Sequence, residues 1–412
     1  MKFIHAADIH LDSPFKGLQK APDKIWQLIH QSTFKAFENL VTTAIDEQVD
    51  FVLLVGDLFD QVHHSIQADL FANQQFERLN QAQIPVFLSY GNHDFLNQDT
   101  ELIAYPQNVH VFDQVIPQTK RLTLADGTEV AIVGFSYDRQ AVKEDVVAQF
   151  PVREAVDFEI GMVHGSMDSL NAPEANYAPF SKNELLALHY DYWALGHIHK
   201  RQILNETPNI IYPGNLQGRH KNEAGEKGFY LVTEHDHQLV PEFRRASVIE
   251  WQTATIAVQG EATFEDLKQQ ILTRTQAASN DHPQFMAVTL QNVQVLASNV
   301  LVRVEDGSLL EVVQQALLQD NQTAIWIYEL NLASTQALSH LAALDKDYWE
   351  QSRQHVFSLA NLDQLAGKLL NYDFIATTLT DKAQIAQIQK LTEVLLLENG
   401  EQEGSSNENS EN

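Results

Sequence analysis

Cysteine is absent from all 412 residues, which excludes disulfide bonds and thiolate metal sites. Any bound metal ion must therefore use nitrogen and oxygen ligands. The chain also lacks an apolar run near the ~18 residues that a membrane-spanning helix needs, and its N-terminus lacks the basic and apolar regions of a secretion signal. Since a chain without cysteine suits a reducing compartment, we expect a cytoplasmic protein without membrane contact.

Positive charge is scarce. The sequence has 27 Lys and Arg against 55 Asp and Glu, a formal net charge of -28, and both halves of the chain are acidic. Proteins that hold nucleic acid by general electrostatic attraction need a basic surface. Any contact with DNA would therefore depend on a local basic patch, on bound metal or on a partner chain.

The length predicts two or three domains. Polar residues of the metal-ligand type follow the predicted strands only up to about residue 250. We therefore place a domain boundary there, after a first domain of residues 1–250. The pattern then predicts a small α+β module at 251–335 and a helical segment at 336–400. The polar, acidic tail at 401–412 is too hydrophilic to pack, and we expect it to be disordered.

The first part of the chain alternates between strand and helix patterns. Apolar runs of strand length occupy 3–8, 51–55 and 86–89, and helical spacing of apolar residues is found at 22–47 and 70–79. This β-α-β-α-β order favours an α/β sheet whose functional site lies along one edge.

Polar side chains follow these three strands and two later ones. They are Asp8 and His10, Asp57, Asn92 and His93, His164, and His197 and His199. Histidine nitrogens and Asp or Asn oxygens are ligands of divalent cations. Seven ligands and one spare histidine predict a two-metal site, with Asp57 as the shared ligand because a carboxylate can span two cations. Gly91 is expected to permit the sharp turn before Asn92.

Two divalent cations roughly 3.5–4 Å apart polarise a phosphoryl group, lower the pKa of a bound water molecule and stabilise both attacking and leaving oxygens. The ligand inventory therefore predicts phosphoester hydrolysis.

The same residues form five spaced blocks. The blocks are D-x-H at 8–10, G-D-x-x-D at 56–60, G-N-H-D at 91–94, H-G at 164–165 and G-H-x-H at 196–199. Together they resemble the calcineurin-like metallophosphoesterase superfamily. GDLFD, YGNHD, ALGHIH and YPGN are similar to blocks of SbcD-type DNA repair nucleases, and the opening AADIHLDSPFKGL resembles the YhaO-type branch. The resemblance implies a two-sheet β-sandwich flanked by helices, an α/β (α+β) fold, with a small capping module and a helical C-terminus.

The resemblance also implies how the ligands divide. One metal would take Asp8, His10, Asp57 and His199, and the other would take Asp57, Asn92, His164 and His197. His93 remains free to stabilise the transition state or to protonate the leaving oxygen. We hypothesise that Asp60 or Asp94 hydrogen-bonds His93 and holds it cationic. The family implies Mn²⁺, whereas ligand type alone would also admit Mg²⁺, Fe²⁺ or Zn²⁺.

Candidate substrate contacts lie in and just after the YPGN block, namely Asn215, Arg219 and His220. Cationic side chains near a metal site suit phosphate binding, although a solvated basic face is an equally good interpretation. Asn215 stands where similar nucleases more commonly have serine.

The sequence thus predicts a Mn²⁺-dependent DNA nuclease, a 3' to 5' exonuclease acting in repair. By resemblance, its partner is an SbcC-like coiled-coil ATPase, and homodimerisation is also implied. One alternative is a nucleotidase or cyclic-nucleotide phosphodiesterase with the same site. Another is a metal-free scaffold, which would be expected to have lost ligands.

Overall fold

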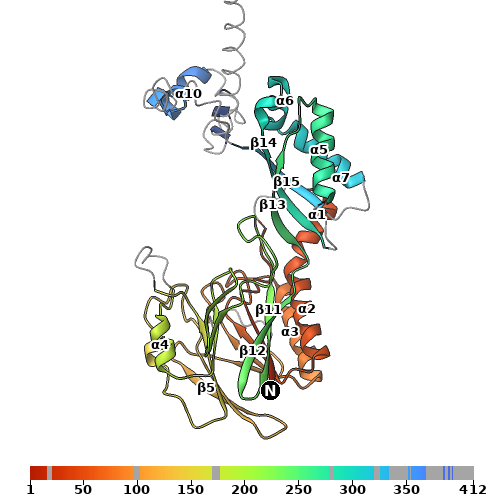
Figure 1. The fold of residues 1–412 in the computed structure, drawn as a ribbon. Coiled ribbons are helices and arrows are strands. Elements are labelled where there is room, and N and C mark those ends of the chain that lie inside the picture. Colours follow the sequence, from red (N-terminus) through yellow and green to blue (C-terminus); the bar gives the residue numbers. More distant parts are fainter. Residues whose placement is uncertain are drawn as a thin grey trace, which may run out of the picture. The chain divides into compact units, whose positions relative to one another are not determined.

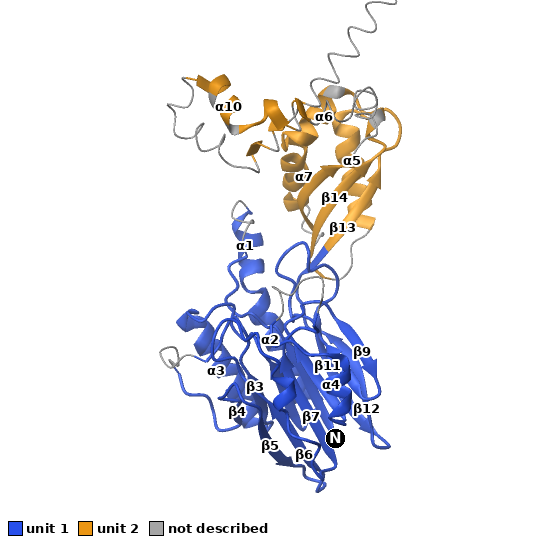
Figure 2. Ribbon diagram, turned by 90° about the vertical axis from the view of Figure 1, so that its left-hand side faces the viewer, with its two compact units in different colours: residues 1–251 blue, residues 252–412 orange. Residues whose placement is uncertain are grey.

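The computed structural model describes residues 1–15, 21–96, 103–168, 177–277, 282–319 and 325–333, and parts of 351–392. The chain forms two compact units, Met1–Trp251 and Gln252–Asn412 (Figure 2). Most of the expected helical segment 336–400 and the whole tail 401–412 lie outside the described residues.

The first unit contains two six-stranded sheets. The first sheet has the order β12 (Gln238–Arg245), β11 (Gly228–His235), β1 (Lys2–Ala7), β2 (Phe51–Val55), β3 (Val86–Ser89) and β4 (Val109–Val111). The second has the order β5 (Gln118–Thr123), β6 (Glu129–Gly134), β7 (Phe158–His164), β8 (Tyr192–Gly196), β10 (Asn209–Tyr212) and β9 (Gln202–Glu206). Neighbouring strands run parallel from β1 to β4 in the first sheet. In the second sheet, neighbouring strands run parallel from β6 through β7 and β8 to β10. Their carboxyl ends therefore lie at one edge.

The two sheets pack face to face, which confirms the expected sandwich. Alternate residues of a strand point to opposite faces of its sheet. In β1, Phe3 and Ala7 enter the apolar core between the sheets, which also holds Ile160 and Met162 of β7. Ile4 enters a second core beneath the helices. Because the parallel strands are covered on both faces, their sequences read as continuous apolar runs.

Helices α2 (Ser32–Asp46) and α3 (Ile66–Gln81) cover the outer face of the first sheet (Figure 1). The expectation of a single helix at 22–47 is wrong, because α1 (Asp23–His30) ends before Gln31 and α2 follows it. Two short elements accompany the second sheet, the 3₁₀ helix η1 (Val147–Gln149) and α4 (Lys182–Ala187).

The second unit has a three-stranded sheet in the order β13 (Glu250–Ala257), β14 (Gln284–Gln291) and β15 (Ile325–Leu332). Its helices are α5 (Phe264–Ala277), η3 (Val293–Val295), α6 (Ser298–Glu305) and α7 (Ser308–Gln319), with α10 (Leu359–Ala366) farther along the chain. Leu267, Ile271, Val313 and Ile327 are among the residues of its separate apolar core. The described part of this unit thus has the α+β composition that the sequence predicts.

A buried histidine joins the two sheets of the first unit. His5 of β1 is fully buried, with Nδ1 3.0 Å from the Tyr192 hydroxyl and Nε2 3.1 Å from the Leu195 carbonyl. The carbonyl can only accept a hydrogen bond, so Nε2 carries the hydrogen, and Nδ1 accepts from Tyr192. Burial lowers the pKa of His5 from 6.5 to about 3, so the folded protein holds the ring neutral.

We expect His5 to make the protein sensitive to acid. The unfolded chain binds a proton near pH 6.5 and the folded chain does not, so the free energy of unfolding should fall as pH drops from about 6.5 to 3, by up to ~1.4 kcal/mol per pH unit from this residue. Urea unfolding of the parent and of His5→Gln at pH 7 and pH 5 tests this. The parent should lose more stability than the variant, and equal losses would contradict the assignment.

Candidate metal centre

All the predicted ligands lie at the carboxyl ends of parallel strands. Asp8 and His10 follow β1, Asp57 follows β2, and Asn92 follows β3, all in the first sheet, whereas His164 ends β7 and His197 and His199 follow β8 in the second. The site is therefore assembled from both layers of the sandwich. His10 and His199, which are 189 positions apart in the sequence, meet there.

The backbone at the site is unusual. Four of the ligand-type residues have positive φ angles although they are not glycine, with Asp8 at 53°, His10 at 49°, Asp57 at 52° and His197 at 93°. This left-handed conformation is uncommon for residues with a Cβ and costs on the order of 1–3 kcal/mol each. Such strain concentrates at functional sites, and here it occurs at the ends of three of the five strands that contribute ligands, β1, β2 and β8.

Two glycines leave room for these side chains. A Cβ at Gly56, whose φ is 75°, would lie 2.0 Å from His164 Nδ1. A Cβ at Gly91 would lie 2.3 Å from Asp57 Oδ1 and 2.6 Å from His164 Nε2. Gly91 is not among the residues with positive φ, so the expectation that it permits a sharp turn is replaced by a steric role.

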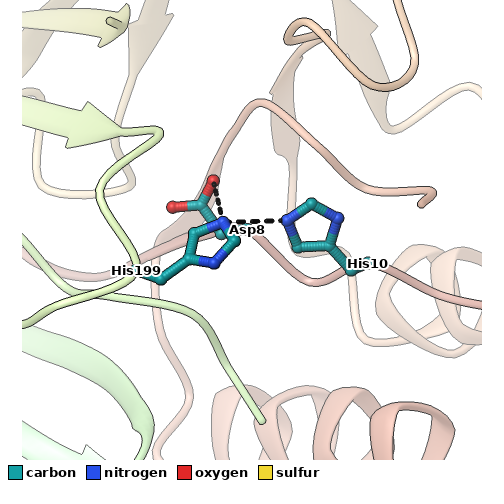
Figure 3. A group of neighbouring side chains, drawn as sticks. All are labelled: Asp8, His10 and His199. Carbon is teal, nitrogen blue, oxygen red and sulfur yellow. Dashed lines mark hydrogen bonds and ion pairs between the residues drawn. The ribbon is translucent and has the colours of Figure 1, made fainter. Parts of the chain in front are cut away.

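The first group of ligand atoms comes from Asp8, His10 and His199 (Figure 3). Nε2 of His10 and Nε2 of His199 lie 3.1 Å apart, and His199 Nε2 is 3.9 Å from Asp8 Oδ1. The Asp8 carboxylate also accepts the backbone N–H of His197 at 3.0 Å. These contacts bring together three members of the first predicted ligand set.

The second group gathers around Asn92. Its Oδ1 lies 3.0 Å from His164 Nε2 and 3.1 Å from His197 Nδ1. The other nitrogen of His164, Nδ1, is 3.1 Å from the Val55 carbonyl. Since a carbonyl accepts only, Nδ1 of His164 carries the hydrogen, and Nε2 keeps a lone pair for a metal ion.

Asp57 lies between the two groups. Its Oδ2 is 3.7 Å from His10 Nε2 and 3.5 Å from His164 Nε2, and its side chain is 1% exposed. One carboxylate oxygen thus faces a ligand nitrogen of each set. This is the position that a ligand shared by two cations would occupy.

The protonation chemistry of the cluster fits divalent cations. Burial, and next the charge of Arg219, lower the pKa of His10 well below its usual range. Burial, and next the neighbouring His164, lower the pKa of His197 to about 3. Both rings are therefore neutral at pH 7, with lone pairs for a metal ion. Burial raises the pKa of Asp8, which His199 and His164 oppose and the Asp57 carboxylate reinforces. A cation between these buried groups would favour the charged carboxylates.

His93 lies beside the cluster. Its backbone N–H donates to Asp57 Oδ1 at 2.9 Å, and its Nδ1 is 2.7 Å from the backbone carbonyl of Asp60. Nδ1 therefore carries the hydrogen, which leaves Nε2 for proton transfer to a substrate. The ring packs edge-on against His10, with centroids 4.9 Å apart.

The hypothesis that Asp60 or Asp94 hydrogen-bonds His93 is confirmed for Asp60, although the contact uses the backbone carbonyl of Asp60. Asp60 contacts His93 through its carbonyl, while its carboxylate lies 3.2 Å from His10 Nδ1 and forms an ion pair with Arg219. Burial raises the pKa of Asp60, against the opposing charge of Arg219. Asp94 is buried and accepts the backbone N–H groups of Leu58 and Gly91, so it shapes the loops. These contacts assign Asp60 to positioning His10.

The three candidate substrate residues differ in exposure. Asn215 is fully buried, and its Nδ2 donates to Gln217 and to Glu223, so its contacts do not support a role at the substrate surface. Arg219 has a side chain 13% exposed and engages Asp60. The side chain of His220 is 52% exposed, and its Nε2 lies 3.3 Å from Glu223 Oε1. Substrate binding by Arg219 and His220 stays a prediction.

Two functional contacts have no sequence signal of their own. Glu223 Oε1 lies 2.7 Å from His199 Nδ1, and Lys227 Nζ donates to the His199 carbonyl at 2.7 Å. In the sequence, Glu223 only dilutes a basic run. The rule that a ligand histidine needs an acceptor for its second nitrogen predicts that such a residue exists, but not which one it is.

Comparisons with known proteins agree with this geometry. A family model described as calcineurin-like phosphoesterase matches residues 1–201. The "Uncharacterized metallophosphoesterase YhaO" of Bacillus subtilis (strain 168) is 37% identical over 349 residues, which are 84% of this chain and 84% of that protein. The "DNA double-strand break repair protein Mre11" of Methanocaldococcus jannaschii is 26% identical over 250 residues, 56% of this chain and 62% of that protein. Its namesake from Thermoplasma acidophilum is 28% identical over 202 residues, 47% of this chain and 52% of that protein.

Among the described residues, no helix combines the length and apolar character needed to cross a bilayer. The extent of the similarity to YhaO, the matched family model and the convergence of the ligand-type side chains at one edge of the sandwich lead to one conclusion. The chain belongs to the calcineurin-like metallophosphoesterase family, whose members are metal-dependent phosphoesterases.

Proposed function

We propose that this phosphoesterase is a Mn²⁺-dependent DNA nuclease, a 3' to 5' exonuclease that acts in DNA repair in the cytoplasm. The observation that carries the proposal is the position of Asp57 Oδ2 between two ligand nitrogens, with His93 held beside the cluster and outside both ligand sets. The similarity to proteins named for DNA double-strand break repair supports DNA as the substrate.

The two ligand sets and His93 suggest how a phosphodiester would be hydrolysed at this site. When bound, two divalent cations supply Lewis-acid polarisation of the phosphodiester and a water molecule of lowered pKa. Asp57 would contact both ions, and the ring nitrogens that lack hydrogens would complete the two sets. In its imidazolium form, His93 would carry a second hydrogen on Nε2 and give it to the leaving 3' oxygen, which returns the ring to its neutral form, while the Asp60 carbonyl fixes the ring through Nδ1.

Cationic side chains are present beside the site although the chain is acidic. Lys200, Arg201, His220 and Lys221 are exposed and follow the last ligand block and the YPGN block. Such side chains could bind backbone phosphates locally. The net charge of -28 opposes a long DNA footprint, so we propose that an SbcC-like coiled-coil ATPase supplies further positive surface. Homodimerisation would double the DNA-binding surface and is part of the same proposal.

The net acidity favours a second candidate function, hydrolysis of a small phosphodiester or nucleotide at the same site. A non-catalytic scaffold is disfavoured, because all seven ligand-type residues are present and lie together. Scaffolds descended from enzymes need not keep such strained positions.

An assay of the full chain distinguishes the two enzymes. We expect Mn²⁺-dependent release of nucleotides from a 3'-labelled duplex, measured beside hydrolysis of bis-p-nitrophenyl phosphate. Omission of Mn²⁺ and addition of EDTA serve as controls. Cleavage of the small diester with none of DNA, even with the ATPase partner added, would replace the nuclease with a small-substrate phosphodiesterase.

A further inference from the structure

The ring of His199 is held from outside the ligand sets. Glu223 lies in the loop between β10 and β11, its side chain is 6% exposed, and its Oε1 is 2.7 Å from His199 Nδ1. His10 Nε2 lies on the opposite side of the same ring, 3.1 Å from His199 Nε2. One nitrogen of His199 therefore faces a carboxylate and the other faces the metal centre.

The contacts of Glu223 determine which nitrogen carries the hydrogen. Its Oε2 accepts from Asn215 Nδ2 at 2.8 Å and from the Arg219 backbone N–H at 2.7 Å. The Arg219 guanidinium lies 3.8 Å from Glu223 Oε1 and 3.5 Å from His199 Nδ1, farther from that nitrogen than the carboxylate oxygen at 2.7 Å. An ionised carboxylate can only accept, so His199 Nδ1 must donate.

The opposite tautomer would block the site. A neutral imidazole carries one hydrogen, and placing it on Nε2 would point an N–H at His10 Nε2 and Asp8 Oδ1 where a cation is expected. It would also leave Nδ1 and the Glu223 carboxylate as two acceptors 2.7 Å apart. Both effects favour hydrogen on Nδ1 and a lone pair on Nε2.

Lys227 holds the same residue in a different way. Its Nζ donates to the His199 backbone carbonyl at 2.7 Å, and its side chain is largely buried. This contact fixes the loop that carries His199, but it does not reach the ring. Glu223 and Lys227 thus separate two effects, orientation of the ring and placement of the backbone.

We propose that Glu223 is a positioning residue that fixes the Nδ1–H tautomer of His199 and so keeps Nε2 available to a divalent cation. The proposal rests on the metal centre of the proposed function and is independent of which phosphodiester is cleaved. Carboxylate partners of ligand histidines contribute 10- to 100-fold to metal affinity in proteins.

Two measurements on the full chain test the proposal without any substrate. Long-range ¹⁵N–¹H spectra of the histidine-labelled, metal-free protein report the tautomer of His199, and calorimetric titration with Mn²⁺ reports affinity. For Glu223→Ala, we expect loss of the fixed Nδ1–H tautomer and affinity about 10- to 100-fold weaker. Glu223→Gln should restore part of both, because its carbonyl still accepts from Nδ1. Glu226→Ala, which removes the same charge from an exposed position, should match the parent.

A double-mutant cycle separates positioning from general loss of structure. If Glu223 acts through His199, then Glu223→Ala should cost no further affinity in a His199→Ala background. Lys227→Met should weaken Mn²⁺ binding while the tautomer of His199 stays fixed, and this serves as a folded reference if Glu223→Ala does not fold. Parent-like affinity, or an unchanged tautomer, in Glu223→Ala and Glu223→Gln would overturn the proposal. A parent protein that binds Mn²⁺ but cleaves no DNA would instead refute only the proposed nuclease function.

Discussion

Replacing Asp57 by alanine should abolish binding at both metal positions and reduce turnover by at least about 10³-fold, since even one electrostatic group of an active site is worth 10²–10³-fold. Oδ2 of Asp57 faces His10 Nε2 and His164 Nε2, one from each ligand set, so a single truncation removes a ligand from both. Titration calorimetry with Mn²⁺ should show that the stoichiometry of tight binding falls from two to none.

A matched control removes an aspartate that lies elsewhere. Asp46 is exposed at the end of α2, so Asp46→Ala makes the same chemical change away from the site and should bind Mn²⁺ as the parent does. If Asp57→Ala still bound two equivalents of Mn²⁺ at parental affinity, Asp57 would not be the shared ligand.

Replacing His93 by alanine should have the opposite profile, with Mn²⁺ affinity and stoichiometry retained and turnover reduced by 10²–10⁴-fold. His93 contacts Asp57 only through its backbone N–H, which alanine preserves, while its ring is held by the Asp60 carbonyl. The loss should therefore fall on proton transfer and leave the ligand geometry intact.

Calorimetry and a labelled-duplex assay on one preparation separate these effects. His235→Ala, at an exposed position of β11, controls for the loss of an imidazole and should leave both readouts unchanged. Loss of Mn²⁺ affinity in His93→Ala would make His93 a ligand and require a different proton donor.

The sequence predicts the strand ends of this site well because each strand end is determined by residues that are adjacent in the sequence. An apolar run such as 51–55 fixes a buried strand, and the polar residue that follows it must emerge at the sheet edge. The prediction of two sheets and the assignment of the ligands to two metal ions depend on the resemblance to the metallophosphoesterase superfamily. No short stretch of the sequence indicates that β1 and β8 lie in different sheets. The sequence does not reveal the break between α1 and α2, because apolar residues at helical spacing continue on both sides of Gln31.

Contacts within the site are less predictable, because they depend on which atom of a side chain faces which neighbour. Asp60 touches His93 through its carbonyl and His10 through its carboxylate, a distinction that the motif G-D-x-x-D does not contain. Asn215 and Glu223 belong to one loop whose fold buries both. Their roles follow from that loop's conformation and from no residue pattern.

The construction of the site from both sheets has a consequence for the stability of the whole unit. Asp8 and Asp57 belong to the first sheet, and His164 and His199 to the second, so cations bound between them would cross-link the two layers. His10 and His199 are 189 residues apart in the sequence, and ions that bind only the folded arrangement of these residues would stabilise it by mass action. In a chain without cysteine, catalytic ions would thus join segments that are distant in the sequence, and removing them would lower the stability of the fold as well as stop the chemistry.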